Sequence, residues 1–253
     1  MNTIALHIHR PTLTTAFLVE IRKLRASLAL LLALVAPTLI AVFVFFNLLR
    51  LESAPPAART LLASTAIWAF FMLPMSVTAL TALLANTEHG PRSWDHLRAL
   101  PVPRWQFYAA KAACVLVIVA AMSVALLGMV LLAMQAAAWI KPVIAPTGDL
   151  ELGRCAWILL RMFLAAWLLV AVQLWIALRW QSFVPALATG IGGTFFAVVA
   201  TSAKIGAVLP WQIPVNQLSG DPVIEQFALL LGFGGGCVAL LAMLLDLSRR
   251  EVR

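Results

Sequence analysis

Long runs of apolar residues, separated by short polar segments, dominate the chain. Six of these runs are long enough to form a helix of about 20 residues, which is the length that crosses a hydrocarbon core of ~30 Å. The pattern therefore predicts an all-α membrane protein with six transmembrane helices. The predicted spans are residues 28–49, 61–85, 108–134, 155–178, 183–203 and 226–247.

These spans and their short connections take up nearly all of the 253 residues. We therefore expect one transmembrane domain over residues 1–253, without a separate soluble domain. The first run is long enough to remain as an anchor, and no small-residue cleavage site follows it closely. For this reason we do not interpret it as a removable signal peptide.

An amphipathic pattern precedes the first span. Apolar residues recur three or four positions apart between residues 13 and 28, and charged residues occupy much of the remaining surface. This spacing indicates a helix in the membrane interface, whereas the alternative is a disordered charged leader that only orients the first span. The residues assigned to the interfacial helix are Phe17, Glu20, Ile21, Lys23, Leu24 and Arg25.

A second polar segment follows the second predicted span. Pro91 suits the first turn of a helix and Pro101 ends one, so the sequence predicts a short helix between them. Trp94 and Leu97 form part of its apolar edge. Because so short a helix is not stable alone, the membrane interface or a soluble partner must bury that edge.

The net charge of +8 reflects orientation in the membrane rather than binding to nucleic acid. If the N-terminus is cytoplasmic, twelve of the 18 Lys and Arg residues fall on the cytoplasmic side, and Asp and Glu divide evenly. This is the bias of cytoplasmic loops, and it places both termini in the cytoplasm. The six basic residues assigned to the outer side are Arg50, Arg59, Lys141, Arg154, Arg161 and Lys204.

Few polar or unusual residues interrupt the spans. Arg161 lies one or two turns inside the outer edge, where its side chain either reaches the lipid head groups or lines an outer cavity for acidic or phosphate-bearing cargo. Gly232 and Gly236 form a G-x-x-x-G pair, which predicts a close helix contact within the chain or between subunits. The cysteines lie at different depths and the histidines lack a ligand spacing, so we expect neither a disulfide nor a metal site.

The segment between the fifth and sixth spans carries prolines and a tryptophan among apolar residues. It is either a short interfacial or re-entrant element that caps a cavity, or a tight loop anchored by its aromatic residue. The residues assigned to this outer cap are Pro210, Trp211 and Pro214.

Three of these segments resemble those of one family, the type-2 ATP-binding-cassette (ABC) exporter permeases. The closest branch is that of the lantibiotic-immunity and bacitracin-resistance permeases. The polar segment after the second span is similar to the cytoplasmic loop of this family, the N-terminal helix to its interfacial elbow, and the proline–tryptophan segment to its outer element. The residues that carry the resemblance are Glu88…Trp94…Leu97…Leu100-Pro101-Val102-Pro103-Arg104…Phe107-Tyr108…Lys111, then Glu20…Lys23-Leu24-Arg25…Ser27, and Pro210-Trp211…Pro214.

The resemblance implies a mechanism. In such permeases the loop helix and the elbow dock on a separate cytoplasmic ATPase dimer, and ATP-driven closure of that dimer opens a pathway between two permeases, identical or related. The sequence has no G-x-x-x-x-G-K-[ST] phosphate loop, so ATP would be hydrolysed by the partner and this chain would bind no cofactor. By position, the residues that would couple to the ATPase are Glu88, Arg92, Trp94, Leu97 and Arg98.

The sequence thus predicts a permease subunit of the bacterial cytoplasmic membrane that exports an amphipathic cargo, such as a peptide antibiotic. Two alternatives remain open: an intramembrane enzyme acting on lipid, and a membrane scaffold without transport. An enzyme would require a cluster of ionisable residues facing water inside the membrane, which the spans do not offer. A scaffold would not need the loop helix between the second and third spans.

Overall fold

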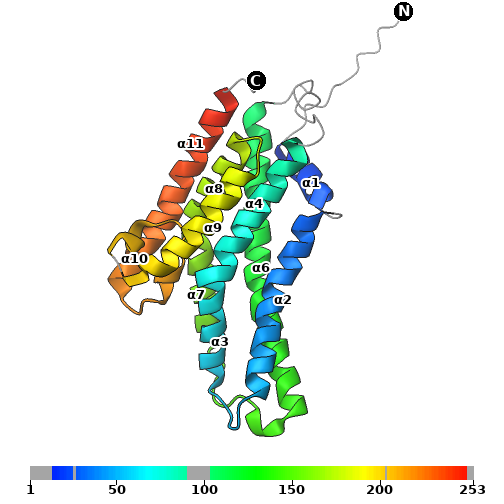
Figure 1. Cartoon of the computed structure of the whole chain (residues 1–253), viewed down its shortest axis with the longest axis vertical. Helices are drawn as coiled ribbons and strands as arrows, with labels where there is room; N and C mark the ends of the chain where they lie inside the picture. Colours follow the sequence, from blue (N-terminus) through cyan, green and yellow to red (C-terminus); the bar gives the residue numbers. More distant parts are fainter. Residues whose placement is uncertain (1–12, 25–26, 90–102, 203, 250–253) are drawn as a thin grey trace, which may run out of the picture.

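The computed structural model describes residues 13–24, 27–89, 103–202 and 204–249. Within these ranges the chain forms helices that pack side by side in a bundle (Figure 1). The α-helices are α1 (Leu13–Leu24), α2 (Leu28–Leu49), α3 (Ala57–Ile67), α4 (Leu73–His89), α6 (Arg104–Ile140), α7 (Leu152–Ala165), α8 (Trp167–Arg179), α9 (Val184–Val199), α10 (Pro222–Leu229) and α11 (Gly235–Arg249).

The all-α prediction is confirmed for the described residues, and five helical stretches are long and apolar enough to cross a membrane. The remaining predicted span, the fifth at residues 183–203, corresponds to α9, which has 16 residues. At 1.5 Å per residue it would cover about 24 Å, less than the usual hydrocarbon thickness. The number six therefore stays a prediction. The five long stretches are Leu28–Leu49, Ala57–Thr87, Arg104–Ile140, Leu152–Arg179 and Pro222–Arg249.

Two of these stretches contain a wide π-helical turn. The first, Trp68–Met72, joins α3 to α4 and comes just before Pro74. A proline inside a helix lacks its amide hydrogen and crowds the carbonyl one turn earlier, and a wider turn relieves that crowding. The second, Leu230–Gly234, joins α10 to α11.

The packing buries one side of most helices. α2 lies along α6, α11 lies along α8, and α4 contacts both α8 and α9. Trp68, Ile40 and Met122 are fully buried in the resulting core, whereas Leu31 and Phe43 on α2 are more than half exposed. An apolar outer surface of this kind is what a helix facing lipid requires.

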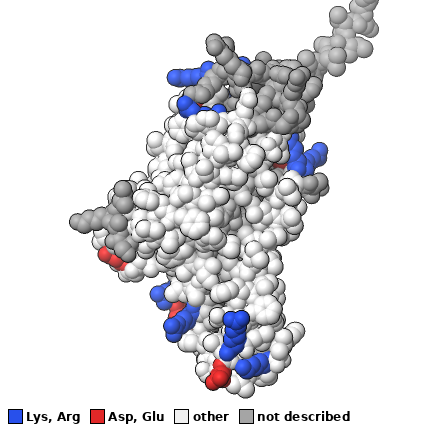
Figure 2. Space-filling view, viewed as in Figure 1, with Lys and Arg blue, Asp and Glu red and all other residues white. Residues whose placement is uncertain are grey.

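Charged side chains gather mainly toward the two ends of the bundle, and a broad uncharged band lies between them (Figure 2). We call one end the α1 end, because α1 lies there together with the last turn of α4, the start of α6 and the last turn of α11 (Figure 1). The opposite end holds the turns between α2 and α3 and between α6 and α7. The two ends offer different candidate sites.

Candidate functional site

At the α1 end, a buried ion pair joins α1 to the first turns of α6. The carboxylate of Glu20 accepts hydrogen bonds from two ammonium groups, that of Lys111 at 2.9 Å and that of Lys23 at 3.0 Å. Lys111 is only 1% exposed and Glu20 only 6%. Because burial makes both charges costly unless they meet, this pair favours one position of α1 on α6 over others.

Lys111 lies in a buried part of α6. Its neighbours in sequence, Ala110 and Ala112, are buried as well. The long stem of Lys111 reaches its partner without solvent between them. Movement of α1 relative to α6 would break a buried charge pair, so the two are expected to move together.

The predicted interfacial helix is present as a helix, α1. Phe17, Ile21 and Leu24 are half-buried, Lys23 is exposed, and Arg25 lies outside the described residues. Glu20 faces the protein core and not the polar side of the helix. The position of α1 in a membrane interface stays a prediction.

The predicted coupling helix falls outside the described residues at Arg92, Trp94, Leu97 and Arg98. Glu88 belongs to the last turn of α4. α4 ends and α6 begins at the α1 end of the bundle, so both attachment points of residues 90–102 lie near α1 (Figure 1). The role of these five residues stays a prediction.

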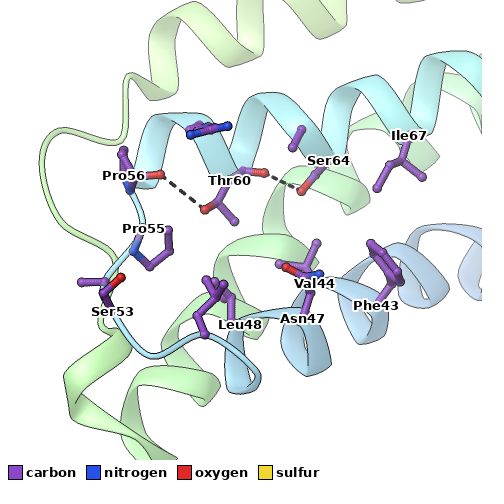
Figure 3. A pocket seen from close by; sticks show the side chains of 14 residues that line it. Phe43, Val44, Asn47, Leu48, Ser53, Pro55, Pro56, Thr60, Ser64 and Ile67 are labelled. Atoms are coloured by element: carbon purple, nitrogen blue, oxygen red, sulfur yellow. Dashed lines mark hydrogen bonds between the residues drawn. The ribbon is translucent and has the colours of Figure 1, made fainter.

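At the opposite end, α2 and α3 diverge and leave a cavity of about 610 Å³ between them (Figure 3). Apolar side chains of α2 and α3 line its walls, and polar groups sit among them. Thr60 and Ser64 donate their hydroxyl hydrogens to carbonyls of their own helix, at 3.3 and 2.8 Å. The lining residues are Phe43, Val44, Asn47, Leu48, Leu51, Ser53, Ala54, Pro55, Pro56, Arg59, Thr60, Ala63, Ser64 and Ile67.

The loop at the mouth of this cavity is held in place by the next loop of the same end. The amide of Ala57 donates to the carbonyl of Thr147 at 2.9 Å, and the amide of Thr147 donates to the carbonyl of Pro55 at 3.0 Å. The ammonium of Lys141 donates to the carbonyl of Leu51 at 2.6 Å. The cavity is therefore formed before any ligand enters it.

The predicted outer cap folds back against the bundle. Pro214 is buried, and Pro210 and Trp211 are half-buried. The ring of Trp211 lies directly over Gly193 of α9, where a Cβ atom would collide with it. This packing agrees with both interpretations of the segment, as a re-entrant element and as an anchored loop.

Arg161 does not line the cavity between α2 and α3. Its guanidinium pairs with the carboxylate of Glu225 at 3.2 Å, which ties α7 to α10. Both side chains are about one-fifth exposed. The sequence alone could not indicate this partner, because the two residues lie 64 positions apart. A role for Arg161 in an outer cavity stays a prediction.

The G-x-x-x-G pair makes the predicted helix contact, and it does so within the chain. A Cβ atom at Gly232 would collide with the backbone of Ala165, and one at Gly236 with Trp167 and the backbone of Leu168. These are the residues at the junction of α7 and α8. The π-helical turn and the glycines together bring two backbones into contact there.

Sequence reasoning missed two polar residues that the fold puts to use. Lys111 entered only through the family resemblance and the charge count, and Asp246 was given no role. Asp246 of α11 accepts hydrogen bonds from Trp175 at 2.9 Å and from Arg179 at 3.0 Å. A lone charged residue in an apolar helix is the available signal for Lys111, but its partner lies 91 positions away.

Comparison with known proteins identifies one family. A family model described as an ABC-2 family transporter protein matches residues 16–201, which include most of α1 and the helices from α2 to α9. No curated protein and no solved structure matches the chain.

Proposed function

The chain belongs to the ABC-2 family of transporter membrane proteins, and we propose that it is the permease subunit of an ATP-driven exporter. In this proposal the chain forms the membrane pathway together with a second permease. A separate cytoplasmic ATPase dimer hydrolyses ATP and supplies the work. This chain itself binds no nucleotide.

The distribution of charge supports a cytoplasmic location for the α1 end. The helix ends at this end of the bundle carry several of the twelve Lys and Arg residues that were assigned to the cytoplasmic side. Among them are Arg22, Lys23, Arg104 and Arg249. Cytoplasmic loops and termini carry such an excess in membrane proteins. With this orientation both termini are cytoplasmic, and the cavity between α2 and α3 opens toward the outer side of the cytoplasmic membrane.

The observation that carries the proposal is the attachment of α1 to α6 where residues 90–102 connect α4 to α6. Residues 90–102 lead into α6, and the ion pair between Glu20 and Lys111 joins α1 to α6. A partner that pushes on residues 90–102 and on α1 therefore acts on α1 and α6 as one unit. Force applied there passes along the 37 residues of α6 to the opposite end. A single long helix transmits such a push with little loss, since its backbone hydrogen bonds continue without interruption.

The cargo in this proposal is an amphipathic molecule such as a peptide antibiotic. Support comes from the cavity between α2 and α3, whose lining combines apolar walls with a few polar groups. Pockets of this composition bind molecules that have both apolar and polar parts. Export of an antibiotic would make the complex a resistance or immunity transporter.

Co-purification tests the ATPase partner. We expect the affinity-tagged chain, purified from its own host in mild detergent, to bring down a protein that contains a phosphate loop. Trp94→Ala combined with Leu97→Ala removes the predicted apolar anchors and should lower ATPase recovery at least tenfold. Recovery is measured by quantitative mass spectrometry of the eluate.

A matched control uses the same residue types at the other end of α6. Trp139 and Leu132 are 78% and 70% exposed there, so Trp139→Ala with Leu132→Ala also removes one tryptophan and one leucine from the surface. This variant should keep its ATPase. Equal recovery with both double variants would rule out the coupling assignment, and no phosphate-loop protein in any eluate would rule out the transporter proposal.

A further inference from the structure

The cavity between α2 and α3 has the chemistry of a site for a negatively charged amphiphile. We propose that it binds molecules that combine one anionic head group, phosphate or carboxylate, with an apolar tail. The binding itself follows from the cavity alone. The assignment of such molecules as cargo, with this cavity as their outer site, rests on the proposed function.

The head-group preference follows from which hydrogen-bond donors are free. The hydroxyls of Thr60 and Ser64 already donate to backbone carbonyls of α3 (Figure 3). Among the described residues, neither the guanidinium of Arg59 nor the amide of Asn47 has a hydrogen-bond or ion-pair partner. A ligand in the cavity therefore meets two free donor groups, one of which is a permanent cation.

The guanidinium of Arg50, at the end of α2, also has no partner among the described residues, but it does not line the cavity. Three other cations of this end differ from Arg59 in having a partner. Lys141 donates to a backbone carbonyl, Arg154 pairs with Glu151 at 2.9 Å, and Arg161 pairs with Glu225. None of the described residues that line the cavity is acidic. An anionic head group would thus find a positive charge that no carboxylate in the lining neutralises, and guanidinium binds phosphate and carboxylate through paired hydrogen bonds.

The tail preference follows from the walls. Phe43, Val44 and Leu48 of α2 face Ile67 of α3 across the cavity (Figure 3). A volume of about 610 Å³ lies within the range of roughly 300–1,000 Å³ that binds small molecules. An inorganic anion would leave these walls in contact with water, whereas an alkyl chain would cover them.

The loop between α2 and α3 is already tied in place beside the cavity, which favours binding. It is tied to the neighbouring loop by the two backbone hydrogen bonds between residues 55–57 and Thr147. Lys141 fixes the same loop through Leu51. A ligand therefore does not have to order the loop when it enters.

Photo-crosslinking tests the proposal on the full-length chain without any ATPase. The chain is placed in nanodiscs of phosphatidylcholine and exposed to dodecyl phosphate that carries a diazirine in its tail. We expect peptides of residues 43–67 to be labelled, and the matched dodecyl trimethylammonium probe to label them about tenfold less, as loss of a charge-assisted hydrogen bond implies.

Two variants locate the site. Arg59→Gln should lower labelling by dodecyl phosphate about tenfold, whereas the control Arg154→Gln, which removes a cation outside the cavity, should leave it unchanged. Ala63→Trp should fill the space and abolish labelling while Arg59 remains. Arg59 and Ala63 are both exposed, so neither change disturbs the core.

Equal labelling by both probes, or full labelling of Arg59→Gln, would overturn the proposal. Competition by inorganic phosphate at the concentration of the probe would also overturn it, because the tail would then contribute nothing. With one quarter phosphatidylglycerol in the nanodisc, reduced labelling supports membrane lipid as the amphiphile, and unchanged labelling supports a molecule from outside the bilayer.

This test separates the site from the transport function. A chain that labels as expected but recovers no ATPase would keep the anion site and lose the transporter proposal. A chain that recovers its ATPase but labels equally with both probes would keep the transporter proposal and lose the anion site.

Discussion

Two regions of this bundle pack their helices in opposite ways. We call the junction of α7 and α8 with α10 and α11 the seam, because Gly232 and Gly236 bring its backbones into contact with residues 165–168. We call the diverging ends of α2 and α3 the mouth, where a cavity of about 610 Å³ separates the helices. The seam has no room for a methyl group, and the mouth has room for a ligand.

The difference shows how helices in lipid acquire rigid and open regions. Lipid tails are as apolar as leucine, so apolar side chains alone do not press helices together in a membrane. Glycine lets backbones meet and gain dispersion contacts, and this happens at the seam. At the mouth the facing residues are larger, two prolines precede α3, and hydrogen bonds tie the loop between α2 and α3 to the loop that holds Thr147. The seam is thus suited to move as a unit, and the mouth to bind.

The largest expected loss of stability concerns the contact between α1 and α6. This contact resembles the seam in being close, although it is made by an ion pair and not by glycines. Glu20→Ala removes the acid beside the buried ammonium of Lys111 and should cost about 3 kcal/mol of stability. The double variant Glu20→Leu with Lys111→Met replaces the pair by apolar groups and should recover most of that loss. Thermal unfolding in detergent, followed by intrinsic fluorescence, measures both. A double variant no more stable than the single one would contradict the account.

The seam itself should be intolerant of a single methyl group. Gly232→Ala forces a Cβ atom against the backbone of Ala165, which cannot rotate away, and should cost about 2 kcal/mol. Gly234→Ala, two residues along, meets nothing within 4 Å and should be neutral or slightly stabilising. Paired melting curves of the two variants give the answer. Equal losses would mean that the seam is not a backbone contact.

A smaller effect is expected where charge ties α8 to α11. Asp246→Asn weakens the hydrogen bonds from Trp175 and Arg179 and should cost about 1 kcal/mol, since the site is partly exposed. The control Arg154→Gln breaks a more exposed ion pair and should fall within about 0.5 kcal/mol of the parent. Urea titrations in detergent compare the two. A larger loss for the control would show that burial does not govern these contacts.

The mouth should tolerate added bulk. Ala63→Trp places a large side chain in open space and should change stability by less than about 0.5 kcal/mol. The same melting assay checks it against Gly232→Ala. A loss as large as that at the seam would show that the mouth is closed in solution.

The apolar pattern of the sequence predicts the main helices well, because span length and hydropathy are local properties. The first predicted span coincides with α2 at residues 28–49, and the third lies inside α6. α6 begins four residues before its predicted span, since Pro103 and Arg104 suit a helix start better than its interior. The fifth predicted span, residues 183–203, is shorter as an α-helix, because the chain turns into a 3₁₀-helix at Ala200.

The candidate sites are less predictable, because they depend on contacts between distant residues. The partner of Glu20 is separated from it by 91 positions, and no spacing rule joins the two. The cavity arises from the angle between α2 and α3, which no residue of either helix encodes alone. The G-x-x-x-G spacing predicted a close helix contact at Gly232 and Gly236. It could not predict that the contact is made with the junction of α7 and α8.

The most direct test of the account is whether ATP moves the mouth and leaves the seam unchanged. Two chains are prepared, each with one pair of spin labels, and each is reconstituted with the ATPase that the proposed function requires. One pair, at exposed Val42 and Leu62, spans the mouth, and the other, at exposed Leu160 and Val238, spans the seam. Distances are measured by pulsed electron paramagnetic resonance with and without ATP trapped by vanadate. We expect the distance across the mouth to change and the distance across the seam to stay constant. A constant distance across the mouth, or an equal change across the mouth and the seam, would contradict the claim that ATP moves only the mouth.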